Sequence, residues 1–216
     1  MIRSLSFPSR SPFLPAFNIE CFEEKLPDDL TKRLAEIILI EEPNILKSTQ
    51  AHKDDPDPTW LTSRLWQYNL FDFDYPEVSE LKEWIRNQYV SFLEQKGLEP
   101  QTVYAQCWAN IVRNHRTIFK HNHATAHSDI PPEYSYLSGN ICIAAEGTRT
   151  CYQNPLISQH VIGMVNVPGT MIIFPSYVNH WVDENRSPNP RLSIAFDLIP
   201  ESTYNLSKNK SNFRRL

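Results

Sequence analysis

Apolar residues recur at helical spacing in the first half of the chain. In the segment that opens at Pro27-Asp28-Asp29 they stand three or four positions apart, which predicts a first amphipathic helix carrying Leu30, Leu34, Ile37 and Ile38. A second helix is predicted from about Pro76 to Lys96, where Gly97 ends it. Its apolar stripe consists of Val78, Leu81, Trp84, Ile85, Tyr89, Phe92 and Leu93.

From Thr102 onward the pattern changes to short runs of β-branched and aromatic residues, separated by Gly, Pro, Asn or Asp. The runs are typical of strands; they are TVYAQCWANIV, YLSGNICIAA, HVIGMVNV, GTMIIF, HWVD and RLSIAFDLI. Many short strands with turn residues between them predict a β-sandwich or barrel. Because the helices precede the strands, we expect an α+β fold with the helices packed on one side of the β unit.

A length of 216 residues suits one well-cored domain and is short for two. We therefore expect a single domain over residues 1–216. Within it we expect a helical support region at about 19–98, a β core at about 102–199 and a tail at 200–216. The basic run from Lys208 to Arg215 in that tail is expected to be solvated.

The two predicted helices are separated by a polar, proline-rich stretch, AHKDDPDPTWLTSRLW. Loops of this length often serve as lids or binding loops, so the part from His52 to Thr62 is a candidate lid. The aromatic residues of this region line a cleft or belong to the core; they are Trp60, Trp66, Tyr68, Phe71, Phe73 and Tyr75.

The net charge of -4 argues against a binder of duplex nucleic acid, whose affinity comes largely from phosphate neutralisation. No apolar stretch is long enough for a membrane span, and the prolines of MIRSLSFPSRSPFLP would break a signal-peptide core. We expect a cytoplasmic protein that acts on a small molecule or a protein side chain, without a membrane partner; a homodimer is compatible with the sequence. The cysteines form no CxxC pair, so reduced, structural thiols are expected at Cys21, Cys107, Cys142 and Cys151.

Histidine placement is the most informative feature of the sequence. In His121-Asn122-His123 the two imidazoles stand at i and i+2, which in a strand puts them on one face and lets them bind one metal. A second pair of this kind, His127-Ser128-Asp129, contains a carboxylate. His180 opens a strand far downstream. Two histidines and a carboxylate on one side of a non-haem iron are a known donor set, which leaves other positions open.

Arg191 opens the strand RLSIAFDLI, in which alternation puts it on one face with Ser193 and Asp197. Leu192, Ile194, Phe196 and Leu198 occupy the opposite, apolar face. A guanidinium in such a strand needs an anionic partner, because burying it unpaired is costly. A dicarboxylate ligand, held by Arg191 with a hydroxyl from Ser193, would supply one. The alternative is a local ion pair with Asp183 or Asp197.

Six motifs follow one another in an order that resembles the Fe(II)/2-oxoglutarate-dependent oxygenase superfamily, and within it a small, uncharacterised bacterial and phage group. They are Trp108-Ala109-Asn110, His121-Asn122-His123, Leu137-Ser138-Gly139, Phe174-Pro175-Ser176, His180 and the strand from Arg191 to Phe196. The resemblance covers about residues 108–198. It implies a double-stranded β-helix, the jelly roll also found in cupins, with Fe(II) and 2-oxoglutarate as cofactors.

Carried over position by position, the resemblance implies that His121, His123 and His180 face the iron. Arg191 would pair with the remote carboxylate of 2-oxoglutarate, assisted by Ser193. Asn110 stands where many relatives place a polar residue that hydrogen-bonds the cosubstrate; its alternative role is a residue at a strand end.

The chain departs from the superfamily at His123, where Asp or Glu is usual. The family-like register therefore implies a three-histidine site, whereas His127 and Asp129 would restore two histidines and a carboxylate. We favour His121 and His123, because their spacing from Trp108-Ala109-Asn110 fits the look-alike group.

Three functions remain open at this point. The first is a 2-oxoglutarate-dependent hydroxylase or demethylase of unknown substrate, which Arg191 and Ser193 favour. The second is a cupin-like metalloenzyme with three histidines and no 2-oxoglutarate, which the missing carboxylate favours. The third is a non-catalytic metal-binding barrel; a three-histidine zinc hydrolase is a more distant alternative.

Overall fold

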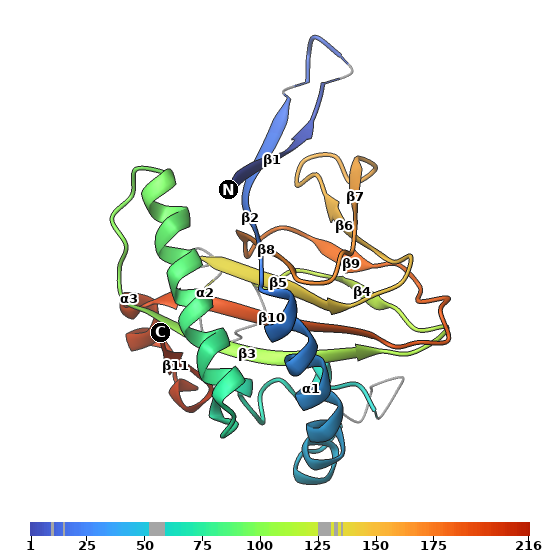
Figure 1. Ribbon diagram of the computed structural model, residues 1–216. Helices are drawn as coiled ribbons and strands as arrows, with labels where there is room; N and C mark the ends of the chain where they lie inside the picture. Colours follow the sequence, from blue (N-terminus) through green and yellow to red (C-terminus); the bar gives the residue numbers. More distant parts are fainter. Residues whose placement is uncertain (10, 15, 52–58, 125–130, 132–133, 135) are drawn as a thin grey trace.

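Two antiparallel β-sheets form the core of this computed structural model, which describes residues 1–216 except 10, 15, 52–58, 125–130, 132–133 and 135 (Figure 1). In the described residues, the large sheet contains, in spatial order, β1 (Ile2–Phe7), β2 (Phe17–Lys25), β8 (Thr170–Pro175), β5 (Leu137–Ala144), β10 (Arg191–Pro200), β3 (Val103–Val112) and β11 (Arg214–Arg215). The small sheet contains β4 (Ile118–His121), β9 (His180–Val182), β6 (Arg149–Gln153) and β7 (Val161–Val165).

Two long helices, α1 (Asp28–Ser48) and α2 (Pro76–Gln95), cover the outer face of the large sheet (Figure 1). The predicted boundaries of α2 are confirmed: Pro76 occupies the first turn, and Gly97 has a φ of +66°. The amide of Gly97 donates to the carbonyl of Glu94, and the amide of Leu98 donates to that of Leu93. This pair of hydrogen bonds is a Schellman motif, which satisfies the last carbonyls of the helix.

The two faces of β10 separate as the alternation predicts. Leu192, Ile194, Phe196 and Leu198 belong to one apolar cluster with α1 and α2. Phe196 packs so closely on Gly139 of β5 that a Cβ there would lie 2.1 Å from its ring. The opposite face of β10, which starts at Arg191, is also buried and looks toward the small sheet. This inner face is where a binding cleft between the sheets can form.

The predicted helical region at 19–98 is wrong at its start. Residues Phe17–Lys25 form β2, which pairs with β1 and β8. Its two faces serve different clusters, because Phe22 packs with the helices whereas Ile19 and Cys21 pack between the sheets. Phe17, Ile19 and Cys21 alternate with polar residues, which is a usable strand signal that the helical interpretation overlooked.

The segment 200–216 is also more ordered than the predicted solvated tail. It forms the short helix α3 (Glu201–Leu206) and the strand β11, which pairs with β3. Phe213 is buried, and Tyr204 stacks on Tyr104 with ring centroids 3.7 Å apart. Arg214 forms an ion pair with Asp72, so part of the basic run serves the packing of the fold.

Most of the predicted lid, residues 52–58, lies outside the described residues. The described part continues through a short 3₁₀ turn at Thr62–Arg64. Farther along, Tyr68, Phe71 and Phe73 pack against the main apolar cluster, as core residues do. In the part of the chain that the structure describes, no helix is long and apolar enough to cross a membrane.

The four cysteines have the expected structural character. All are buried, and none forms a disulfide; they are Cys21, Cys107, Cys142 and Cys151. Cys142 belongs to β5 on the inner face of the large sheet, opposite Ser193 in the register of β10.

Candidate metal centre

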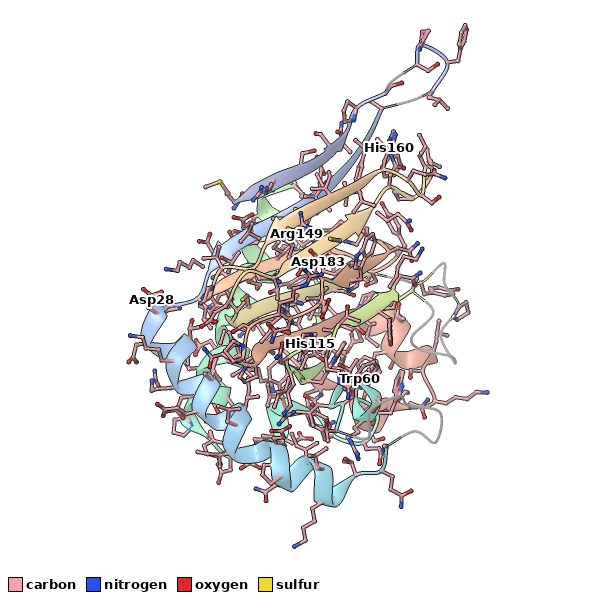
Figure 2. All side chains as sticks on the ribbon, turned by 90° about the vertical axis from the view of Figure 1, so that its right-hand side faces the viewer. Asp28, Trp60, His115, Arg149, His160 and Asp183 are labelled. Atoms are coloured by element: carbon pink, nitrogen blue, oxygen red, sulfur yellow. The ribbon has the colours of Figure 1, made fainter. Side chains whose placement is uncertain are left out.

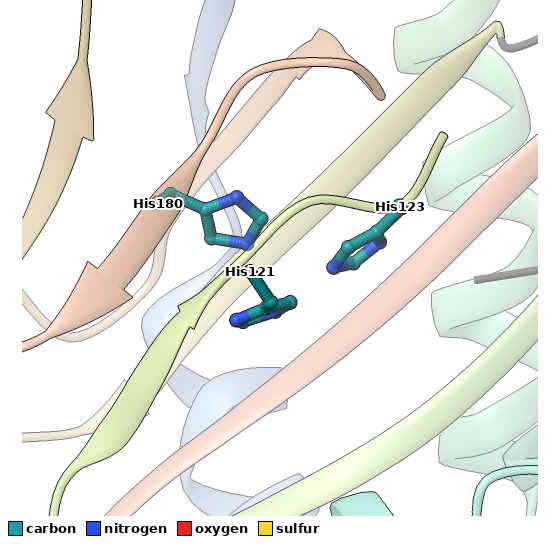
Figure 3. Close-up of side chains that lie close together, drawn as sticks. All are labelled: His121, His123 and His180. Carbon is teal, nitrogen blue, oxygen red and sulfur yellow. The ribbon is translucent and has the colours of Figure 1, made fainter. Parts of the chain in front are cut away.

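Three histidines lie close together where β4 and β9 meet (Figure 3). His121 is the last residue of β4, His180 is the first residue of β9, and the two are register partners. His123 follows two residues after His121. One possible ligand atom from each ring lies within 4.8 Å of the other two, and Figure 3 shows the rings turned toward the same space. The structure therefore brings together the three histidines selected from the sequence.

Strand alternation does not explain the position of His123, contrary to the sequence-based argument. β4 ends at His121, and His123 lies in the bend that follows. The amides of His123 and Ala124 both donate to the carbonyl of Ser176, at N–O distances of 2.9 and 3.1 Å. Ser176 belongs to the turn that leads into β9, so this turn holds His123 beside the other two histidines.

The hydrogen bonds of the rings determine which nitrogens are free. Nδ1 of His121 lies 2.7 Å from the carbonyl oxygen of Phe119, and Nδ1 of His180 lies 2.9 Å from that of Val178. Nδ1 of His123 lies against a carboxylate oxygen of Asp197. Carbonyl and ionised carboxylate oxygens only accept, so each Nδ1 must carry the proton and donate. Each Nε2 then keeps its lone pair, as a metal ligand requires.

Burial keeps the imidazoles of His121 and His180 neutral. Burial, with a smaller contribution from the neighbouring His123, lowers the pKa of His121 to about 4. Burial also holds the pKa of His180 well below its usual range, with smaller contributions from His123 and His121. Near neutral pH both rings are therefore uncharged, and their Nε2 lone pairs are available to a cation.

Asp197 connects the histidines to the large sheet. Its carboxylate accepts from Nδ1 of His123 and from the hydroxyl of Ser138, which lies 2.6 Å away. The Ser138 hydroxyl also lies within donating distance of the Ser176 hydroxyl, at 2.8 Å. Ser138 has one proton, so the carboxylate and the Ser176 oxygen compete for it. This buried chain orients His123 and places one negative charge behind it.

Arg191 lies on the same inner face and is 1% exposed. Its Nη1 donates to the Ser193 hydroxyl at 2.8 Å, whereas Nε and Nη2 are buried without a hydrogen-bond partner. Burial lowers its pKa. The two acids considered as its partners are engaged elsewhere, because Asp183 pairs with Arg149 (Figure 2) and Asp197 with His123. Within the described ranges, no carboxylate forms an ion pair with Arg191.

A cleft between the sheets, called here the inner cleft, borders both the space around the histidines and the neighbours of Arg191. This cavity of about 410 Å³ is lined by Cys142 and Asn140 of the large sheet and by Tyr152 of the small sheet. Asn140 also lines the narrow space around the three histidines. Cys142 and Tyr152 lie close enough to Arg191 to influence its pKa. The inner cleft therefore lies between residues near Arg191 and residues near the histidines.

Asn110 also lies on the inner face, as the register partner of Ser193 on β3. Its side-chain oxygen accepts a hydrogen bond from the Thr62 hydroxyl. Asn110 lines the space around the histidines, so it stands near the predicted cosubstrate position. It also ties the segment after the predicted lid to the β core.

The alternative pair, His127 and Asp129, lies outside the described residues, so that choice stays a prediction. Sequence reasoning missed the role of Asp197 and the structural role of Ser176. The alternation of β10 placed Asp197 on the inner face with Arg191, which was a usable signal. Alternation within β10 could not predict that Asp197 contacts His123, which belongs to a different part of the fold.

Residues 106–197, which include every described candidate ligand, match the model of a family described as "Putative 2OG-Fe(II) oxygenase". No curated protein matches the chain. The family match does not distinguish the bacterial and phage group within the superfamily, which stays a prediction.

Solved structures of such enzymes share the fold at low identity. A prolyl-4-hydroxylase from Pseudomonas putida aligns over 84% of this chain and 92% of its own, with a TM-score of 0.57 and 13% identity. EctD from S. alaskensis, solved with 2-oxoglutarate and 5-hydroxyectoine, aligns over 85% of this chain and 73% of its own, with a TM-score of 0.62 and 14% identity. The non-heme, alpha ketoglutarate dependent carbocyclase SnoK has a TM-score of 0.58 at 11% identity and covers 83% and 78%. The predicted double-stranded β-helix is thereby confirmed.

Proposed function

We propose that this chain, in which residues 106–197 match the 2OG-Fe(II) oxygenase family model, is such an oxygenase and binds Fe(II) through His121, His123 and His180. The donor set fits the ion, because imidazole is a good ligand of iron and all three Nε2 atoms keep their lone pairs. Three ligands from one side leave the remaining positions to cosubstrate and oxygen.

We further propose that Arg191 and Ser193 hold the remote carboxylate of 2-oxoglutarate. The observation that carries this assignment is the fully buried guanidinium, with two unpaired nitrogens, on the face of the large sheet that looks toward the small sheet and its histidines. Ser193 accepts from Arg191, so its own hydroxyl proton is free to go to the ligand. A guanidinium and a carboxylate form charge-assisted hydrogen bonds, often in pairs. Asn110 lies near enough to contribute a further polar contact.

Bound iron and 2-oxoglutarate supply the oxidation: O₂ converts 2-oxoglutarate to succinate and CO₂, and one oxygen atom enters the substrate by hydroxylation or as the first step of demethylation. The residues of this chain orient the reactants and exclude water. Asp197 fixes the ring of His123, and buried side chains such as Phe174 and Trp108 enclose the space around the histidines.

The second candidate is a cupin-like enzyme that uses three histidines and no 2-oxoglutarate. The three-nitrogen donor set favours it, since His123 stands where the superfamily usually has a ligand carboxylate. Asp197 weakens this argument, because its carboxylate is hydrogen-bonded to His123 and so still places a negative charge near the metal. The unpaired Arg191 favours the oxygenase, because a cupin of this kind gives it no counter-charge.

Further proposals concern the location of the protein, its domain organisation, its substrate and its oligomeric state. Four buried thiols without disulfides suit a cytoplasmic protein. One apolar cluster joins α1 and α2 to β3, β5, β8 and β10, which suits a single domain over residues 1–216. The substrate is proposed to be a small molecule or a protein side chain, and a homodimer is compatible with these features.

Iron binding should depend on His180. Replacing His180 with alanine removes one of three donors, so stoichiometric Fe(II) should be lost under anaerobic titration. His115→Ala is the matched control, because this exposed histidine pairs with Glu184 far from the site. If the His180→Ala variant retained iron, His180 would not be a ligand. Loss of iron in Asp129→Ala, with His123→Ala unaffected, would show that the alternative pair binds the metal.

Cosubstrate binding should depend on Arg191. Charge-assisted hydrogen bonds contribute roughly 1.5–3 kcal/mol, so Arg191→Ala should weaken 2-oxoglutarate binding at least about tenfold. Iron affinity should hardly change, and Arg191→Lys should be intermediate because it keeps the charge but loses the planar fork. The measurement is the metal-to-ligand absorption band of the iron-loaded protein under argon, with Arg149→Ala as the control. A wild-type protein without band or affinity would favour the cupin-like enzyme instead.

A further inference from the structure

A second cavity, called here the outer pocket, lies beside the histidines. It occupies about 190 Å³ between β4 and the end of β3, and the segment Trp60–Thr62 closes one side. At this end β3 pairs with β10 on one side only, because β11, on its other side, pairs in the described residues only with Tyr104 and Ala105. The outer pocket therefore fills the gap between the edges of the two sheets.

The outer pocket and the space around the histidines share part of their lining. Thr62, Asn110, Ile118 and His121 line both. The inner cleft meets the space around the histidines at a different residue, Asn140, and is also lined by Cys142, a neighbour of Arg191. A metal held by the histidines would thus be approached by the cosubstrate from one side and by a molecule in the outer pocket from another.

The walls of the outer pocket are apolar and partly aromatic. The rings of Trp60 and Phe119 lie 5.5 Å apart and are inclined by 59°, and Ile111 and Ile118 complete the lining. Phe119 is 60% exposed although it is a large aromatic side chain. Aromatic rings set at an angle make two surfaces on which a flat apolar group can pack. An apolar lining next to a reactive centre is typical of a substrate site.

The volume of the outer pocket and the charge of Lys120 limit which molecules can bind there. An apolar cavity of about 150 Å³ is enough to take up benzene, so the outer pocket holds one ring with a short substituent. Lys120 lies on its rim, is exposed, and forms no ion pair among the residues that the structure describes. A bulge in β4, between Ile118 and His121, lets Phe119 and Lys120 line the same pocket although they are consecutive. Lys120 therefore offers a positive charge to a molecule whose ring lies against Phe119.

We propose that the outer pocket binds the substrate, and that the substrate is a small aromatic or cyclic carboxylic acid. Its ring packs on the surfaces that Trp60 and Phe119 turn toward the pocket, its carboxylate pairs with Lys120, and the carbon to be oxidised faces the metal beside His121. This inference rests on the proposed function, because it takes the histidines as the metal site. It adds a substrate class to an oxygenase whose fold alone specifies none.

The test uses the full chain loaded with Mn(II) and 2-oxoglutarate, and phenylacetate as the probe. Phenylacetamide is the matched compound without the negative charge, and acetate is the matched compound without the ring. Binding is measured by calorimetry, and distance from the metal by the relaxation that Mn(II) induces in the ring protons. We expect phenylacetate to bind best of the three and its ring protons to relax faster than they do with Mg(II).

Three variants identify the pocket. Phe119→Ser should weaken phenylacetate binding about fivefold or more, since aromatic pairs contribute beyond the area they bury. Lys120→Glu should weaken it about tenfold or more and leave phenylacetamide unchanged. Leu156→Ser is the control, because Leu156 is 63% exposed and lies between β6 and β7, away from β4.

Phenylacetate that binds no better than acetate, or that binds equally to Phe119→Ser, overturns the proposed substrate class. Failure of the proposed function looks different. In that case phenylacetate binding still depends on Phe119 and Lys120, but Mn(II) does not relax its protons and 2-oxoglutarate does not bind.

Discussion

At the scale of single residues, the most consequential contact is that between His123 and Asp197. In the proposed ligand set a histidine stands where the superfamily usually has a carboxylate, and the carboxylate of Asp197 lies directly behind that histidine. The negative charge is thus carried by the residue behind the ligand instead of by the ligand itself, and it stays in a buried hydrogen-bond network with Ser138 and Ser176. A hydrogen-bonded carboxylate makes an imidazole a stronger donor and holds its orientation.

Asp197→Asn should therefore weaken metal binding about 10-fold to 100-fold, the usual cost of removing such a partner. Asparagine keeps an oxygen that accepts from His123, so the orientation is retained and the charge is lost. The readouts are Co(II) affinity and the visible spectrum of the Co(II) protein, which reports the ligand field directly. Asp183→Asn is the control, since Asp183 pairs with Arg149 on the small sheet. Unchanged affinity and spectrum in Asp197→Asn would reduce Asp197 to a packing role.

For single residues, the sequence predicted which side chains have the right chemistry and which face of a strand they occupy. It did not predict which residues of the two sheets contact each other. The three histidines, Arg191, Ser193 and Asn110 were all selected; the described structure brings Asn110 beside the histidines and makes Asn110 the register partner of Ser193. Asp197 was considered only as a partner for Arg191. The register of two sheets decides which residues meet, and that register depends on the whole fold rather than on local alternation.

At the scale of elements, the contact of β5 with β10 depends on a missing side chain. Gly139 lies opposite Phe196, and the ring occupies the volume that a Cβ would need. The helices α1 and α2 lie over this part of the large sheet, so the ring has little room to move outward. The backbone beside the metal centre is therefore held by close packing.

Gly139→Ala should destabilise the protein by about 1–3 kcal/mol, the usual cost of overpacking a core. The measurement is the free energy of unfolding from urea titration. Gly163→Ala on the edge strand β7 is the comparison, because its Cβ would lie 3.4 Å from Arg149, an ordinary contact. That change should stay within about 0.5 kcal/mol. Equal effects of the two substitutions would show that Phe196 adjusts freely.

Element prediction succeeded where the pattern was local. Both long helices and the strands β3, β5, β7, β8, β9 and β10 followed from spacing and turn residues, whereas β1, β2, β4, β6 and β11 did not. The strands that were missed are mostly short or rich in polar residues, and each depends on a partner strand for its hydrogen bonds. β4 was missed as an element although its histidine His121 was selected.

At the scale of the whole molecule, the proposed ligands bridge the two sheets. His121 and His180 belong to the small sheet, whereas Arg191 and Asp197 belong to the large one. Metal and 2-oxoglutarate bind only when these sheets are correctly apposed, so both should stabilise the folded state. A ligand at a hundred times its Kd contributes about 2.7 kcal/mol.

Each ligand at that concentration should raise the melting temperature by roughly 5–11 °C, given the usual 2–4 °C per kcal/mol for a chain of this size. Scanning fluorimetry with Mn(II), and then with Mn(II) and 2-oxoglutarate, measures the two increments. Arg191→Ala should keep the first increment and lose most of the second. The idea of a cross-sheet link fails if neither ligand moves the transition of the wild-type protein.

The buried cysteines bear on how long such an enzyme survives its own chemistry. Thiolates react with oxidants far more readily than thiols do. Cys142 lies in the inner cleft, where burial raises its pKa to about 11 despite the opposing effect of Arg191. Burial likewise raises the pKa of Cys107, and of Cys21 and Cys151 to about 11. A protein that activates oxygen beside these sulfurs thus keeps them in their least reactive form, and so limits self-inactivation between turnovers.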